Sequence, residues 1–269
     1  MFRTKLFGVV AGLTLAATGV SGAQTVTAKL TAPYAPNAGS VTAFGYYMSP
    51  YSGTVNGTTE RFNCVDFFHD VTVGQVWTAT VVNLGAAILN PSLLLSTRDG
   101  TPGVYSLGDA LNIYEQVAWL TDQMPLNPAS DKNRTIAVQT AIWSLANNAP
   151  SSPSSMQYAN TGDFWANGGK VSTINATSTN TDPGSTGYWI YQAQTQSASQ
   201  AAGYYDKFNI LTDVNKANSN SVQEFIYSTP EPGTFVLIGT GLAMLMGLIV
   251  YSRRREELLG RGYSSGMLG

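Results

Sequence analysis

The feature that most constrains this chain is an uncharged apolar run near its C-terminal end, from Thr234 to Ser252. At about 1.5 Å per residue this run spans roughly 28 Å as a helix, which is close to the hydrocarbon thickness of a bilayer. A helix is favoured there because a backbone in lipid must satisfy its hydrogen bonds internally. Three arginines follow the run and favour the cytoplasmic side. The pattern predicts one C-terminal transmembrane helix, about residues 234–252, and a cytoplasmic tail, residues 256–269.

A short proline motif stands just before the apolar run. The order of a Pro-Glu-Pro triplet, an apolar helix and a basic cluster resembles the PEP-CTERM sorting signal, here over residues 229–255. This resemblance implies cleavage by an exosortase-type sorting peptidase. The protein would then be anchored transiently in the inner membrane and afterwards reach the cell surface or the extracellular matrix. The alternative is that the C-terminal segment is a simple membrane anchor. The residues that carry the resemblance are Pro230, Glu231, Pro232, Arg253, Arg254 and Arg255.

The N-terminal end has the pattern of an export signal. Arg3 and Lys5 form a basic start, and residues 6–20 form an apolar stretch. Ser21 and Ala23 are small residues at the −3 and −1 positions of a cleavage site before Gln24. We therefore expect a signal peptide over residues 1–23, Sec export and removal by signal peptidase. An uncleaved N-terminal anchor is the alternative. The working part of the chain is then an ectodomain over residues 24–228.

The composition of this ectodomain limits its partners. It contains eight Lys and Arg residues against thirteen Asp and Glu residues, so its formal charge is about −5. That charge argues against binding to nucleic acid or to anionic lipid. The chain has one cysteine, Cys64, and one histidine, His69. An internal disulfide is thereby excluded, and a closed zinc site is not expected. We expect no metal and no other cofactor.

The hydrophobic period changes along the ectodomain. Its first part reads mainly as strand, with alternation over 24–32 and a β-rich stretch over 70–82. Helical spacing appears over 107–120 and again over 131–147, and the prolines between them predict a helical hairpin. A third helical stretch, 188–207, precedes a closing pair of strands, 208–211 and 222–227. The order predicts an α+β fold, a β-rich domain with a helical insertion. The ranges that carry this prediction are 24–32, 70–82, 107–120, 131–147, 188–207, 208–211 and 222–227.

Two residues suggest a specific chemistry. Cys64 lies between aromatic and aliphatic neighbours, and Gln139 lies at the edge of the buried stripe of the second predicted helix. Trp143, one turn further on, is placed to cover Gln139 and to exclude water. A thiol beside a glutamine carboxamide in a dry, fixed geometry can displace ammonia and form a thioester. We therefore expect a thioester cross-link between Cys64 and Gln139.

The same residues resemble bacterial thioester domains, which are surface modules of adhesins. In that family an aromatic-flanked Cys-hydrophobic element precedes a hydrophobic-Gln-x-x-hydrophobic element in a helix. Val138-Gln139-Thr140-Ala141-Ile142 matches the second element fully. Phe62-Asn63-Cys64-Val65 matches the first in part, because Asn63 replaces the aromatic residue before the cysteine. The resemblance runs over residues 44–145 and, weakly, 223–225. It implies a thioester that acylates amines or hydroxyls on a target.

Three neighbouring residues are possible auxiliaries of this site. His69 is placed to act as a base or an acyl relay, or to satisfy the end of a strand. Asp66 falls on the same face as Cys64 if the segment is extended, where it orients a neighbour or caps a turn. Trp143 is the third.

Three hypotheses of function follow. The preferred one is an adhesion or matrix-anchoring protein, not an enzyme, whose thioester links it covalently to an unknown nucleophile-bearing surface target. The second is a non-reactive structural component of the envelope or the extracellular polymer, in which Cys64 is only a buried small hydrophobe. The third is a cysteine hydrolase that uses a Cys64–His69 dyad, for which the two residues lie unusually close in sequence.

Overall fold

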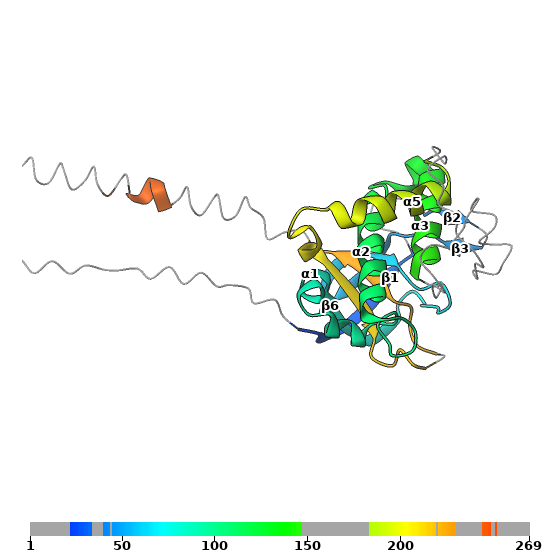
Figure 1. Cartoon of the computed structure of the whole chain (residues 1–269), viewed down its shortest axis with the longest axis horizontal. Helices are drawn as coiled ribbons and strands as arrows, with labels where there is room; N and C mark the ends of the chain where they lie inside the picture. Colours follow the sequence, from blue (N-terminus) through cyan, green and yellow to red (C-terminus); the bar gives the residue numbers. More distant parts are fainter. Residues whose placement is uncertain are drawn as a thin grey trace, which may run out of the picture. The chain divides into compact units, whose positions relative to one another are not determined.

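A closed antiparallel barrel is the centre of the computed structural model (Figure 1). Its strands follow one another around the barrel in the order β1-β4-β5-β8-β7-β6, so the first strand pairs with both β4 and β6. The structure describes residues 22–33, 40–43, 45–146, 183–218, 220–229, 244–248 and 251. The barrel strands are β1 (Gln24–Ala32), β4 (Tyr51–Val55), β5 (Thr58–Cys64), β6 (Val76–Asn83), β7 (Phe208–Asp213) and β8 (Phe225–Ser228).

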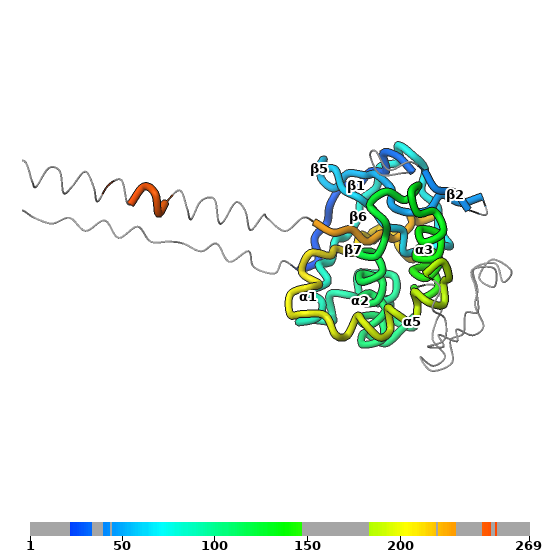
Figure 2. Tube along the Cα trace, turned by 90° about the horizontal axis from the view of Figure 1, so that it is seen from above, coloured from blue at the N-terminus to red at the C-terminus, as the bar shows by residue number. Residues whose placement is uncertain are grey.

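Helices follow the strand β6 and complete the domain. Figure 2 shows α2, α3 and α5 gathered on one side of the barrel. A small hairpin of β2 (Thr42–Ala43) and β3 (Tyr46–Tyr47) forms a separate sheet. The α-helices are α1 (Leu84–Leu89), α2 (Leu107–Gln123), α3 (Lys132–Ala146) and α5 (Thr186–Gln196), and the 3-10 helices are η1 (Pro91–Ser96), η2 (Pro128–Asp131), η4 (Ser197–Ser199) and η5 (Tyr204–Lys207).

Local sequence explains how β4 and β5 come together. Asn56 and Gly57 both have positive φ, 48° and 83°, which is the backbone of a two-residue hairpin turn whose twist matches that of the strands. Val55 therefore pairs with Thr58, and the ladder continues to Tyr51 opposite Phe62. This register brings Cys64, the last residue of β5, to the end of the barrel wall.

Aromatic side chains fill the barrel interior. The ring of Phe225 lies 5.3 Å from that of Phe62, 6.1 Å from that of Tyr51 and 6.0 Å from that of Trp77. Gly53 has no side chain because the Phe62 ring occupies that space: an added Cβ would lie 2.0 Å from Phe62 Cε2. Large rings thus close the core next to the strand end that carries Cys64.

The predicted α+β class is confirmed, and the helical hairpin and the closing strand pair are found as α2 with α3 and as β7 with β8. Several predicted elements differ in extent, and the second closing strand begins at Phe225 instead of residue 222. Residues 70–75 are not strand, because a turn with Gly74 at φ 91° precedes β6. The third helix ends at Gln196 and gives way to short 3-10 turns. The barrel closure itself was not predicted.

The terminal predictions fall mostly beyond this domain. The chain divides into two compact units, residues 1–228 and 229–269, each described by itself. Residues 1–21 of the predicted signal peptide, the sorting motif and its arginines, and the predicted cytoplasmic tail lie outside the described residues. Within the predicted membrane segment, Met244–Leu248 is helical. No helix in the described part of the chain is long and apolar enough to cross a bilayer.

Candidate functional site

The structure brings Cys64 and Gln139 together across a sequence separation of 75 residues (0 % exposed for both). Gln139 Nε2 donates a hydrogen bond to the backbone carbonyl of Cys64 at 2.9 Å. The backbone N–H of Ser49 donates to Gln139 Oε1 at 3.3 Å. Because an N–H only donates and a carbonyl only accepts, these two contacts fix which way the carboxamide faces. The barrel end and the helix α3 thus hold the carboxamide against the cysteine.

Ser49 acts on both members of the pair. Its Oγ accepts a hydrogen bond from the backbone N–H of Cys64 at 2.8 Å, while its own N–H reaches the oxygen of Gln139. Because the serine side chain is short, its hydroxyl contacts Cys64 while the backbone of the same residue contacts Gln139. The sequence offered no signal for this role, since residues 43–59 read only as strand and turn. Ser49 is therefore a site residue that sequence analysis missed.

The thiol of Cys64 is covered by Trp143. The indole Nε1–H donates to Cys64 Sγ at 3.3 Å, and Sγ in turn donates to the carbonyl of Asp66 at 3.1 Å. Burial raises the pKa of Cys64, an effect that the Trp143 hydrogen bond opposes and that the charges of Asp66 and Asp70 reinforce. The thiol is thus neutral and dry. The structure thus places the indole of Trp143, which was expected to cover Gln139, against the sulfur of Cys64.

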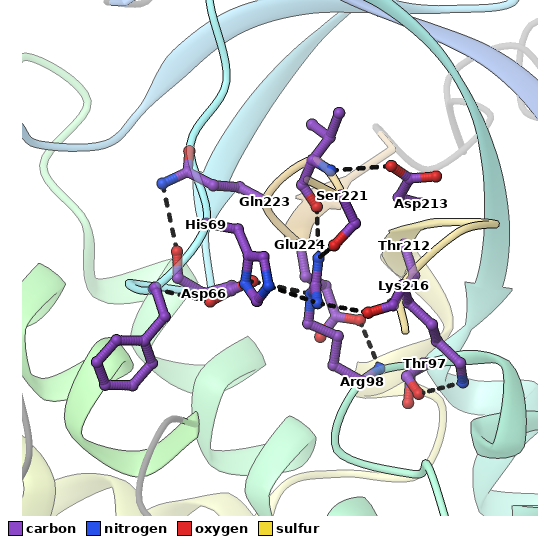
Figure 3. Close-up of polar contacts among 12 residues, drawn as sticks. Asp66, His69, Thr97, Arg98, Thr212, Asp213, Lys216, Ser221, Gln223 and Glu224 are labelled. Carbon is purple, nitrogen blue, oxygen red and sulfur yellow. Dashed lines mark hydrogen bonds and ion pairs between the residues drawn. The ribbon is translucent and has the colours of Figure 1, made fainter. Parts of the chain in front are cut away.

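Asp66 and His69 belong to a charged cluster that also contains Arg98 (Figure 3). Asp66 Oδ2 pairs with His69 Nδ1 at 2.6 Å and with Arg98 Nε at 2.8 Å, and its Oδ1 accepts from the backbone of Phe68 at 2.9 Å. Asp66 therefore both caps a turn and orients side chains, as the sequence suggested. The result is a fixed loop after β5, whose carbonyl at residue 66 accepts a hydrogen bond from the Cys64 thiol.

His69 does not form a dyad with Cys64. Its Nδ1 faces Asp66, and its Nε2 lies 3.4 Å from Arg98 Nη1, so both ring nitrogens are engaged in the charged cluster. The hydrogen bonds of the cysteine sulfur in the described domain go to Trp143 and to the Asp66 backbone instead. This arrangement gives no support to the hydrolase hypothesis, because a thiol and its base must lie within hydrogen-bond reach.

Arg98 and Glu224 complete the cluster, and sequence analysis missed both. The Arg98 side chain donates to the carbonyls of Lys216 and Val222 at 3.0 and 2.6 Å. Its backbone N–H donates to Glu224 Oε2 at 2.9 Å. Glu224, only 1 % exposed, also accepts from the hydroxyls of Tyr114 and Thr212. The available signal was an acidic residue, Glu224, within the predicted strand 222–227 of a chain with few charges.

Comparison of the chain with protein-family models, with curated proteins and with solved structures gives no match. Over the described ranges, no group of three or more His, Cys, Asp or Glu side chains is placed to hold a metal ion.

Proposed function

We propose that this chain is an exported, exosortase-sorted bacterial surface or matrix protein that attaches itself covalently to amine or hydroxyl groups through a Cys64–Gln139 thioester. The observation that carries the proposal is the fully buried carboxamide of Gln139 held in contact with Cys64. A glutamine on an apolar helix usually points to solvent, and burying its amide costs free energy unless it is hydrogen-bonded. Here its two polar atoms meet Cys64 and Ser49.

The chemistry of bond formation balances within the pair. The bond from Cys64 Sγ to Gln139 Cδ forms, the bond from Cδ to Nε2 breaks, and the thiol proton leaves with the nitrogen as ammonia. Negative charge develops on Oε1 during this step, and the N–H of Ser49 is aimed at that atom. The Trp143 Nε1–H is aimed at the sulfur, which carries charge when a target nucleophile later displaces it.

Methylamine tests the reactivity of the site. We expect the full-length wild-type protein to take up one methylamine at Gln139 and to release one titratable thiol, because the amine nitrogen displaces sulfur from the acyl carbon. Peptide mapping locates the adduct, and a thiol reagent counts the released sulfur. The Cys64→Ala variant should take up none. Absence of an adduct on the wild type after denaturation under mildly alkaline conditions would contradict the proposal.

A second candidate function is that of a non-reactive structural component, with Cys64 as a packed core residue. The burial of the thiol and its raised pKa favour this candidate, since inert structural cysteines have these properties. The contact with Gln139 does not require a reaction in this case. One free thiol that reacts with an alkylating reagent only after denaturation would support it.

The proposed sorting signal leads to a separate prediction. Pro230 and Pro232 disfavour helix before the apolar run, so we expect a peptidase to bind the triplet in an extended form. We expect the mature wild-type protein to have lost a tag fused after Gly269 in cells that contain the sorting enzyme. Replacing residues 230–232 with alanines should leave a tagged, membrane-bound precursor. If the tag persists on the mature wild-type protein, as detected by immunoblot, the segment is only an anchor.

A further inference from the structure

An open groove of about 490 Å³ has in its lining Trp143, whose indole covers the Cys64 thiol. The lining also includes Tyr46 and Tyr47 of the small hairpin. Tyr46 and Tyr47 are 45 % and 49 % exposed, so part of each side chain is accessible to a ligand. A concave site lined by aromatic rings, one of which covers the sulfur of the proposed thioester, is a candidate binding site for the acyl acceptor.

The aromatic rings form a continuous row from the surface to the thiol. The ring of Tyr46 lies 5.1 Å from that of Phe67, and the ring of Phe67 lies 5.0 Å from that of Trp143. Trp143 Nε1 then contacts Cys64 Sγ at 3.3 Å. A flat, partly apolar ligand that stacks on these rings is thereby guided toward the sulfur. Sugar rings have such a face, made of C–H groups, with hydroxyls at their edge.

The polar groups of the groove distinguish among ligands. Asp70, Thr72 and Gln223 contribute oxygen and nitrogen atoms to its lining, and none of the described lining residues is Lys or Arg. Anionic polymers are therefore disfavoured, in accord with the negative ectodomain. The carboxylate of Asp70 is close enough to Cys64 for its charge to raise the pKa of the thiol. A lysine amine held beside it would stay protonated, and an ammonium is not a nucleophile.

We infer that the groove binds a neutral saccharide and that one of its hydroxyls is the acyl acceptor of the thioester. This inference rests on the proposed function. In the transfer step the bond from the sugar oxygen to Gln139 Cδ forms, the bond from Cδ to Cys64 Sγ breaks, and the hydroxyl proton ends on the sulfur. The product is an ester on residue 139 and a free thiol. The Asp70 carboxylate accepts a hydrogen bond from the saccharide.

The test is incubation of the full-length protein with neutral gluco-, galacto- and manno-configured oligosaccharides, followed by intact-mass measurement. We expect a covalent adduct with at least one of them. Tyr47→Ala should slow its formation about tenfold, because Tyr47 lines the groove and its accessible ring is a surface on which a sugar can stack. Phe68→Ala is the matched control: Phe68 is 48 % exposed and its ring lies 5.6 Å from that of Phe67, but it does not line the groove. This control should react at the wild-type rate.

Methylamine separates failure of the inference from failure of the proposed function. Methylamine is too small to need the groove, so Tyr47→Ala should react with it at the wild-type rate. If methylamine adds but none of the oligosaccharides does, or if a lysine-containing peptide adds faster than every oligosaccharide, the inference is wrong and the thioester stands. If methylamine does not add, the thioester fails, and the groove is then tested by non-covalent oligosaccharide binding, which Tyr47→Ala should weaken.

Discussion

The full-length wild-type protein should be lighter by about 17 Da than the mass calculated from its own mature termini, because thioester formation expels ammonia. We expect nearly all molecules to carry the thioester, since Cys64 and Gln139 are already held together in a dry site. Little entropy is then lost when the two groups react. Intact-mass spectrometry at mildly acidic pH measures this deficit. Thiol titration after denaturation should find no free sulfur in the same sample.

Three variants make this result specific. Cys64→Ala and Gln139→Ala should each have their full calculated mass, since each lacks one of the reacting groups. Gln116→Ala is the matched control, because Gln116 is another buried glutamine, 6 % exposed, on the neighbouring helix α2. It should keep the deficit. Cys64→Ala is a small change in a buried position and should fold even if Gln139→Ala does not. The test therefore does not depend on Gln139→Ala alone. A wild type of full mass with one alkylatable thiol would refute the thioester.

Local pattern predicted the elements that carry this site better than it predicted their assembly. The helix that carries Gln139 and the closing strand pair followed from spacing alone. The barrel did not, because pairing between β5 and β8 joins Cys64 to Phe225, and no local pattern encodes so distant a register. The barrel closure also determines where Ser49 lies, which explains why its role at Gln139 had no sequence signal.

The burial of Gln139 shows another limit of periodicity. A stripe of apolar residues identifies the core face of a helix whose other face is solvated. In α3, however, Thr135 and every residue from Ala137 to Ala146 are buried, so polar side chains such as Gln139 and Thr140 are as enclosed as the apolar ones. The sequence therefore placed Gln139 at an edge, whereas the packing of α3 against α2, α5 and β5 encloses it.

Replacing Arg98 should destabilise the domain severely. Arg98→Met removes the cation that pairs with Asp66 while Asp99 and Glu224, both buried, remain close by. Loss of one partner of a buried ion pair costs about 3–5 kcal/mol of the free energy of unfolding. For a domain of this size that corresponds to a fall in melting temperature of about 10 °C. Chemical and thermal denaturation of the full-length protein measure both quantities.

The matched control is the exposed pair of Lys207 and Asp122, joined at 2.6 Å, with side chains 25 % and 33 % exposed. Lys207→Met should cost less than about 1 kcal/mol, because water screens such a pair. An unfolding free energy of Arg98→Met equal to that of the control would show that the buried cluster does not need its cation. Thioester formation should also slow in Arg98→Met, since the Asp66–Arg98 pair fixes the loop whose carbonyl accepts a hydrogen bond from the Cys64 thiol.

The cost of losing Arg98 should depend on pH. Burial raises the pKa of Asp99 and of Glu224, and the charge of Arg98 opposes both shifts. An acid whose pKa is higher in the folded state binds more protons there, so its effect on stability becomes unfavourable as pH rises from the unfolded value through the folded value. Without Arg98, the pKa values of Asp99 and Glu224 in the folded state rise further. The pH range over which ionisation of these two acids destabilises the fold therefore becomes wider. The destabilisation by Arg98→Met should therefore be smaller at about pH 4 than at about pH 7.

Asp99→Asn tests the origin of this pH dependence. Asp99 Oδ2 has no hydrogen-bond partner in the described domain, so its ionised form gains little there to offset burial. In the Arg98→Met background, adding Asp99→Asn should restore part of the lost stability at neutral pH and little at about pH 4, where the acid is already protonated. Urea denaturation of the single and double variants at both pH values gives the comparison. An equal recovery of stability at both pH values would mean that the effect of Asp99→Asn comes from packing and not from charge.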